Sequence, residues 1–323
     1  MIDFRYHLVS IVAIFLALTV GIVLGSTVLQ EPLIRSTEEL TAQLQQSNDD
    51  FRKQNTGLLR REAGYDAFVT AVAPQLLRGL LTGERVVIVE APGSDAEMIE
   101  PVTEALVAAG ASVTGRVTLT DKYLAPDQSG LIDQLAATVK PAEVTFPEQA
   151  TPYDKAATVL AGAVVTGSST ESGKKDASSS AVLGAFEDAG LISIDEDPAQ
   201  RAGMAVVIAP TAVYEGQNAE TETGAMVALA SALDSAGKGT VVAGTTAAAG
   251  SGGVLTAIRD TGEVATNVST LDTLDMAAGR AVLVYALREQ LDGGSGQYGL
   301  GPAAGSFLPT ASPTPSPTAG SGG

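Results

Sequence analysis

Residues that could bind a soft metal ion are few and widely separated in this sequence. Such ions favour thiolate, thioether or imidazole ligands, but the chain has no Cys and one His among 323 residues. His7 precedes an uncharged apolar run, and the methionines after the first residue lie far apart, at Met98, Met204, Met226 and Met276. Methionine commonly fills gaps in hydrophobic cores, so the sequence predicts no metal site.

Two glycine-rich stretches could cradle a phosphate group, and neither completes a known motif. Gly167 to Lys175 reads GSSTESGKK, with five residues between its glycines where a P-loop has four, and Lys175 replaces the Ser or Thr that holds magnesium. Gly250-Ser-Gly-Gly253 lacks the third glycine and the later acidic residue of a dinucleotide fingerprint. The first stretch is interpreted as a surface loop, and the second leaves a small-ligand site open as an alternative.

Catalytic residues are equally hard to assemble. With His7 at the edge of the apolar run, no Ser-His-Asp or Cys-His combination is available in the rest of the chain. The acidic turn 195–197 does not match a calcium-binding loop and is interpreted as solvated. A hydrolase built on two carboxylates stays an alternative. We expect a protein that is not an enzyme and that requires no cofactor.

The N-terminal apolar run predicts where the chain resides. Residues 8–29 carry no charge, and about 20 apolar residues suffice to cross the hydrocarbon core of a bilayer. A cleaved signal peptide has a shorter apolar core and a small-x-small cleavage site, which does not follow here. The sequence predicts an uncleaved single-pass anchor, with residues 1–7 in the cytoplasm and residues 30–323 outside it. The lack of Cys suits an oxidising compartment.

A long helix is predicted for residues 30–76, because residues 33–56 contain neither Gly nor Pro. Apolar residues recur in it at alternating steps of three and four. Polar residues interrupt the pattern at Ser47, Gln54 and Arg61, and they weaken the seam or fix its register. The spacing predicts a coiled coil, and a helix packed on its own domain is the alternative. The predicted seam would bind a second copy or a different chain, and it consists of Leu40, Leu44, Phe51, Leu58, Tyr65 and Phe68.

Residues 83–292 alternate between β-branched runs and helical segments. Strands are predicted at 85–90, 111–119, 163–166, 191–194, 204–209 and 240–243. Helices are predicted at 95–109, 128–139, 153–162, 178–189, 221–235, 253–259 and 277–291. This alternation predicts an α/β fold, with a Rossmann-like, mostly parallel sheet and helices on both faces. Residues 293–323 are rich in Pro, Ser, Thr and Gly and are predicted to form a disordered tail.

Composition excludes one class of partner. The net charge of −18 argues against nucleic acid, because phosphate binding needs clusters of Lys and Arg. Apolar residues make up 45% of the chain and aromatic residues only 4%. The core must therefore be built from small aliphatic side chains, as in many α/β domains.

The order of these parts resembles a known family. Residues 1–292 resemble the actinobacterial copper transport family MctB. The resemblance lies in the opening MIDFRYHLVSIVAIFLALTVGIVLGSTVLQEPL, in the helix predicted for residues 30–76 and in the segment GERVVIVEAPGSD. The resemblance implies copper efflux or, in the SteB branch, control of cell-wall hydrolysis together with a membrane partner, SteA. One span cannot enclose a pore alone, and copper ligands are scarce. We therefore expect a partner-binding envelope scaffold, with an oligomeric copper transport component and a small-ligand sensor as alternatives.

Overall fold

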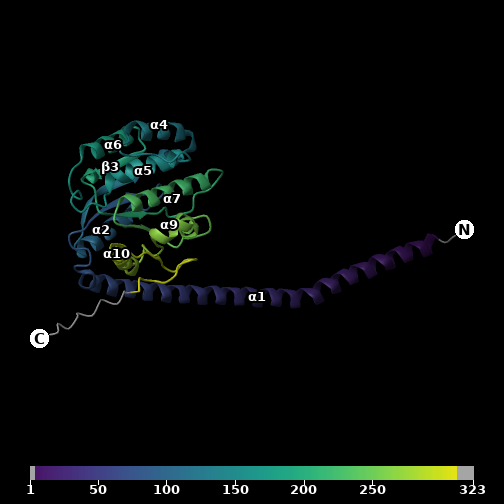
Figure 1. The fold of residues 1–323 in the computed structure, drawn as a ribbon. Helices are drawn as coiled ribbons and strands as arrows, with labels where there is room; N and C mark the ends of the chain where they lie inside the picture. Colours follow the sequence, from purple (N-terminus) through teal and green to yellow (C-terminus); the bar gives the residue numbers. More distant parts are fainter. Residues whose placement is uncertain (1–3, 311–323) are drawn as a thin grey trace. The chain divides into compact units, whose positions relative to one another are not determined.

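The chain forms two compact units, Met1–Tyr65 and Asp66–Gly323. The structure, a computed structural model, describes residues 4–310, except for the side chains of residues 27–39. Helix α1, Phe4–Leu77, makes up the first unit and continues into the second (Figure 1). The sequence predicted the apolar run 8–29 and the helix 30–76 as separate elements. In the structure they form one continuous helix. Its segment Phe4–Ser26, with a mean hydropathy of 2.8, is long and apolar enough to cross a membrane.

A seven-stranded sheet in the order β3-β2-β1-β4-β5-β6-β7 forms the centre of the second unit. All neighbouring pairs are parallel except β2 with β3. The chain leaves β1 for β2 on one side and later returns to β4 on the other, which is the Rossmann-like arrangement that the sequence predicted. The strands are β1 Arg85–Glu90, β2 Ser112–Leu119, β3 Ile192–Glu196, β4 Met204–Ile208, β5 Thr240–Ala243, β6 Ser269–Leu271 and β7 Gln297–Tyr298.

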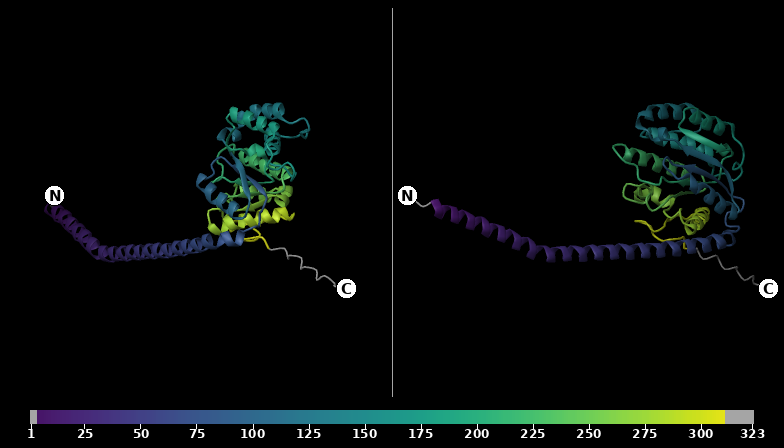
Figure 2. Two further views of the ribbon diagram at one scale, coloured as in Figure 1. Left: turned by 90° about the vertical axis from the view of Figure 1, so that its left-hand side faces the viewer. Right: turned by 180° about the vertical axis from the view of Figure 1, so that it is seen from behind.

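Helices cover both faces of the sheet (Figure 2). Successive side chains of a strand point to opposite faces, so Val87 and Val89 of β1 join one hydrophobic cluster while Val86 and Ile88 join the other. The end of α1 covers the second cluster together with α2 Ile99–Ala108 and α10 Ala277–Leu291. The other face carries α3 Asp121–Leu124, α4 Ser129–Val139, α5 Pro152–Val164, α6 Ala177–Asp188, α7 Ala219–Ala236, α8 Val254–Asp260 and α9 Gly262–Asn267.

The strand predicted at 163–166 is wrong. Residues 163 and 164 are the last residues of α5, and Val165 makes only a single parallel bridge with Ala202. The helix starts on a capping box, in which Thr151 and Asp154 satisfy each other's backbone N–H groups. Once started there, the Ala-rich segment continues as helix, because Ala is the best helix former.

The disordered tail predicted from residue 293 is also wrong for residues 293–310. We call residues 297–308 the C-terminal strap. It supplies β7, which pairs in parallel with β6, and Tyr298 bridges to Ser306 farther along the strap. Phe307 packs against the cluster that contains α10. The strap is therefore part of the folded domain, and residues 311–323 lie outside the described residues.

One acidic side chain of α7 makes the stability of this fold depend on pH. Burial raises the pKa of Asp234 to about 6, partly offset by the Thr240 backbone N–H. Because the folded pKa lies above the unfolded one, the fold gains stability as pH falls from above 6 toward 4. We expect Asp234→Asn to raise the melting temperature at pH 7.5 and to leave it nearly unchanged at pH 4, as measured by circular dichroism.

The matched control is Asp188→Asn, which removes the same charge from an exposed position on α6. It should change the melting temperature little at either pH. Equal effects of Asp234→Asn at pH 7.5 and pH 4 would show that the fold does not raise the pKa of this carboxyl.

Candidate functional site

The predicted seam residues form an exposed row along α1. Leu44 is 69% exposed and Phe51 is 68% exposed, which is unusual for large apolar side chains in a regular row. Residues seven apart stay on one face of a helix, with a drift of about 20° per heptad that supercoiling removes. The row consists of Leu40, Leu44, Phe51, Leu58, Tyr65 and Phe68. Their exposure fits a surface that another chain covers, and the coiled coil stays a prediction.

The last turns of α1 are fixed to the α/β domain. Leu77 and Leu81 are fully buried beside α2 and α10. The Asp66 carboxylate accepts a hydrogen bond of 3.1 Å from the backbone N–H of Ala277, at the start of α10. An acidic group at a helix N-terminus satisfies a free N–H and interacts favourably with the helix dipole. No motif in the sequence signals this cap, because the two residues are far apart along the chain.

The crevice where α/β domains commonly bind nucleotides is closed. It lies at the carboxyl ends of β1 and β4, where the chain changes direction across the sheet. The backbone N–H of Thr211 donates to the Gly93 carbonyl at 2.9 Å. The Tyr214 hydroxyl donates to the Pro92 carbonyl at 3.1 Å, and burial raises the pKa of Tyr214, so this phenol keeps its proton. The two loops bind each other instead of a ligand.

The glycine loop after β5 does not hold the deep pocket that a small-ligand sensor requires. Ala248 and Ala249 inside it are fully buried. A side chain on Gly253 would overlap the Ala248 carbonyl oxygen, so the backbone of the loop is packed against itself. On the outside of the loop, Ser251 and Gly252 form part of the wall of an open hollow beside α7 and α8.

The loop that resembles a P-loop is a surface loop, as predicted. It connects α5 to α6, and Lys175 pairs with Asp197 at 3.3 Å. The N–H of Gly173 donates to the Gln200 carbonyl at 2.8 Å. Helix α6 is capped by Asp176, which accepts from the Ser179 N–H. The groups that a phosphate would need are thus engaged within the protein.

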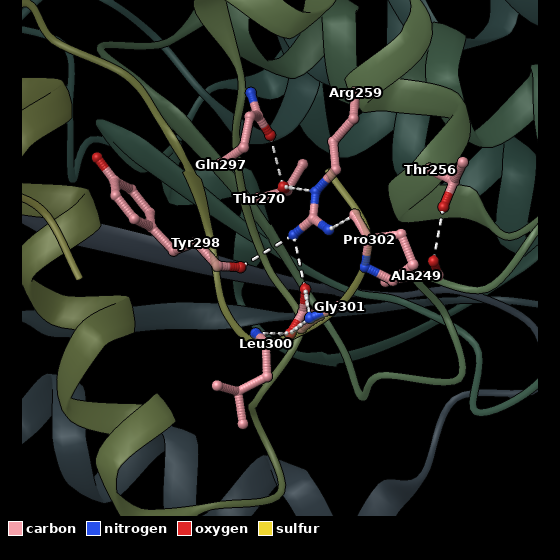
Figure 3. A network of polar contacts seen from close by, with 10 residues as sticks. Ala249, Thr256, Arg259, Thr270, Gln297, Tyr298, Leu300, Gly301 and Pro302 are labelled. Carbon is pink, nitrogen blue, oxygen red and sulfur yellow. Dashed lines mark hydrogen bonds and ion pairs between the residues drawn. The ribbon is translucent and has the colours of Figure 1, made fainter. Parts of the chain in front are cut away.

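A buried ion pair between Arg259 of α8 and Asp272, which follows β6, holds the backbone of the strap, and the sequence did not predict it (Figure 3). The side chains of Arg259 and Asp272 are 1% and 0% exposed, with Nη2 and Oδ2 2.9 Å apart. Arg259 also donates to the carbonyls of Tyr298 and Pro302, both at 2.9 Å. Its Nε donates to the Thr270 hydroxyl at 2.8 Å. Through these bonds the guanidinium binds both the backbone of the strap and a side chain of β6.

The carboxylate of Asp272 completes this network. Its Oδ1 accepts the backbone N–H groups of Leu300 at 2.7 Å and Gly301 at 3.1 Å. Gly299 has φ +129 and lies so close to this carboxylate that a side chain there would overlap it. The acceptor positions of this carboxylate are filled by protein groups, which makes the pair a structural element of the domain.

Soft metal ligands are not brought together by the fold. Met204 and Met226 are fully buried in the two clusters on opposite faces of the sheet. His7 lies in the apolar segment of α1. Within the described ranges, no group of three or more His, Cys, Asp or Glu is placed to hold a metal ion.

At each edge of the sheet, a backbone group of the outer strand is engaged within the protein. At β3 the backbone N–H of Ile194 donates to the Glu187 carboxylate at 3.2 Å. At β7 the carbonyl of Gln297 accepts the N–H of Gly305 at 2.8 Å, within the strap itself. Strand addition by a partner needs free backbone groups at an edge. A partner strand added at either edge would therefore have to displace one of these bonds.

The chain matches the family described as copper transport outer membrane protein, MctB, over residues 1–309. It is 30% identical over 316 residues to the copper transporter MctB of Mycobacterium leprae (strain TN), covering 95% of this chain and 99% of that protein. Identity to the copper transporter MctB of Mycobacterium tuberculosis (strain ATCC 25618 / H37Rv) is 28% over 309 residues, covering 93% and 97%. The matched family length includes the strap, beyond residue 292 where the resemblance was expected to end.

Proposed function

This chain belongs to the MctB family of copper transport outer membrane proteins, and on that basis we propose that it is a membrane-anchored, non-enzymatic subunit of a copper transport assembly. The apolar part of α1 anchors it, and the heptad part joins it to another chain. The observation that carries this proposal is the row of exposed apolar side chains along α1. Its domain stands on the outer side of the anchoring membrane, with the N-terminus in the cytoplasm.

Copper transport by this chain requires an assembly. The described residues contain one segment apolar enough to span a membrane, and a single helix cannot enclose a path for an ion. Met204 and Met226 are buried in separate clusters on opposite faces of the sheet, and Met98 and Met276 are partly exposed. Copper is therefore transported by several copies of the chain, or by the chain together with a partner. This chain supplies the membrane anchor and the contact surface of the assembly.

A second copy of the chain is the partner that best fits the seam. Copies inserted in the same direction present parallel helices, because α1 is continuous from the apolar segment. In a parallel, in-register pair, a residue at heptad position d lies opposite the same residue of the other chain. Arg61 occupies a d position, so two arginines would meet there, and the exposed Glu62 at the flanking e position would supply the opposite charge beside them. Ser47 and Gln54 would form polar layers that fix the register.

Introduced cysteines test this arrangement directly, because the chain has none of its own. In membranes of intact cells, Leu44→Cys and Phe51→Cys should each form a disulfide-linked product of twice the chain mass. Asp49→Cys, on the opposite face of the same helix, should not. The same Leu44→Cys chain should react with a membrane-impermeant maleimide added outside the cells, since α1 beyond the anchor is proposed to lie there.

Three outcomes would contradict parts of this proposal. Adducts to a different membrane protein would replace the second copy by a heteromeric partner, as the SteA-like partner of the SteB branch implies for an envelope-assembly or division role. The absence of any adduct at both seam positions would remove the seam as a contact surface. Labelling only after lysis would reverse the proposed orientation.

A further inference from the structure

The C-terminal strap holds two large apolar side chains in solvent. Leu300 is 64% exposed and Leu308 is 50% exposed. Their backbone is fixed, because the Asp272 carboxylate binds the Leu300 N–H at 2.7 Å and Phe307, beside Leu308, packs against the cluster that contains α10. In Figure 3 the Leu300 side chain points away from Arg259. An exposed leucine on a fixed backbone loses little conformational freedom when another chain covers it, which favours binding.

The last turns of α1 present a second apolar surface, on a different face of the helix from the one that packs on the domain. Ala73 and Leu77 belong to the packed face, against the cluster with α2 and α10. Phe68 and Leu76 are exposed and Val72 is partly exposed. These three residues follow one another at steps of four, so they lie along one side of the helix. Because Phe68 belongs to the seam, the seam continues into the part of α1 that is fixed to the α/β domain.

The strap lies beside these turns of α1 in each view of the fold (Figure 1, Figure 2). Ala73 of α1 and Phe307 of the strap both pack against the same hydrophobic cluster. A chain that follows the seam of α1 as far as Leu76 therefore comes next to the strap. The seam and the strap can thus be covered by one and the same partner.

Charge indicates which partner this is. The chain has a net charge of −18, so two copies repel each other and approach most easily through surfaces without carboxylates. Residues 297–308 contain no charged side chain, and neither do residues 67–77. Asp66, just before them, is bound to the Ala277 N–H. Such a surface attracts no ionic partner, whereas it can bury the apolar last turns of a second α1 without removing a charge from water.

We propose that the strap is the contact of the α/β domain with a second copy of the chain. Leu300 and Leu308 of one copy pack against Phe68 and Leu76 at the end of the other copy's α1. This inference rests on the pairing through the seam proposed above and extends it from α1 to the domain. In a two-fold symmetric pair the contact forms twice, since each copy presents both surfaces. The buried ion pair that binds the strap then has a role besides stability, because it holds the two leucines where they reach the other copy.

Mixed disulfides between two tagged copies test this contact. One form of the full chain carries Leu308→Cys, a second form with a different tag carries Leu76→Cys, and both are expressed in the same cells. Mild oxidation of the membranes should yield a disulfide-linked product that carries both tags. The matched control combines Leu76→Cys with Leu131→Cys, an exposed leucine on α4, which covers the other face of the sheet. This combination should yield no product with both tags.

A second measurement uses no cysteine. Leu300→Ser combined with Leu308→Ser should raise the dissociation constant of the pair by about tenfold or more, because two leucines lose their burial between the copies. Val107→Ser combined with Leu131→Ser, at exposed positions of α2 and α4, should leave it unchanged. Sedimentation of the full chain in detergent measures the constant, and circular dichroism of each variant establishes that it is folded.

Failure of the strap contact can be told apart from failure of the seam. If Leu44→Cys gives a linked pair but Leu308→Cys with Leu76→Cys gives no mixed product, the seam stands and the strap contact is overturned. The absence of both products would overturn the two together. Mixed products of equal yield from Leu131→Cys and Leu308→Cys would show random collision and would also overturn the strap contact, as would equal dissociation constants for the two serine variants.

Discussion

Replacing Asp272 by alanine is expected to lower the free energy of unfolding of the α/β domain by about 3–5 kcal/mol, because the buried Arg259 guanidinium then loses its counter-charge. The N–H groups of Leu300 and Gly301 lose their acceptor in the same step. Urea denaturation of the full chain, followed by far-ultraviolet circular dichroism, gives the change in free energy. The strap should also become sensitive to protease before the domain unfolds, since this carboxylate holds it.

An exposed pair on the same domain is the control. Arg288 and Asp292 also lie 2.9 Å apart, but their side chains are 47% and 55% exposed. Asp292→Ala should therefore cost no more than about 1 kcal/mol. Equal losses for Asp272→Ala and Asp292→Ala would show that the buried pair does not hold the strap. If Asp272→Ala fails to fold, Asp272→Asn provides a milder version, because it keeps the shape and one acceptor oxygen.

Placing acidic residues at two seam positions should abolish the pairing of chains. In a pair, Phe51→Asp with Leu58→Asp would replace apolar layers by four buried carboxylates. Removing a buried Phe or Leu alone costs about 2–5 kcal/mol, so the dissociation constant should rise by at least about 1,000-fold. Sedimentation of the full chain in detergent measures the pairing. Cells that depend on this variant should accumulate copper as cells without the chain do.

The control variant carries the same two charges on the opposite face of α1, as Thr56→Asp with Ala63→Asp. Both positions are exposed, so pairing and copper content should stay as in the unchanged protein. Loss of pairing with normal copper content would separate the assembly from copper transport and favour the envelope-scaffold role. Unchanged pairing in the seam variant would show that the exposed apolar row is not the contact surface.

The α1 seam and the buried Arg259–Asp272 pair differ in whether the sequence alone predicts them. The seam follows from spacing alone, because a helix places residues three and four apart on one face whatever surrounds it. The same is true of the apolar span and of the β-branched runs such as residues 85–90, which the structure contains as β1. Each of these features is local, because a helical spacing or an unbroken apolar run can be recognised in a short stretch of sequence. The family resemblance drew on the same local features and is confirmed by the match over residues 1–309.

The tertiary structure decided the contacts between residues that are distant along the chain. The strap looks disordered by composition, and it is ordered because Arg259 and Asp272 bind its backbone. The strand β6 has only three residues, too few for a period to be recognised. The Asp66 cap on α10 and the closed crevice at Gly93 likewise join distant segments. Local propensity cannot specify such contacts. They stabilise the fold only after the sheet has brought both partners together and removed the water between them.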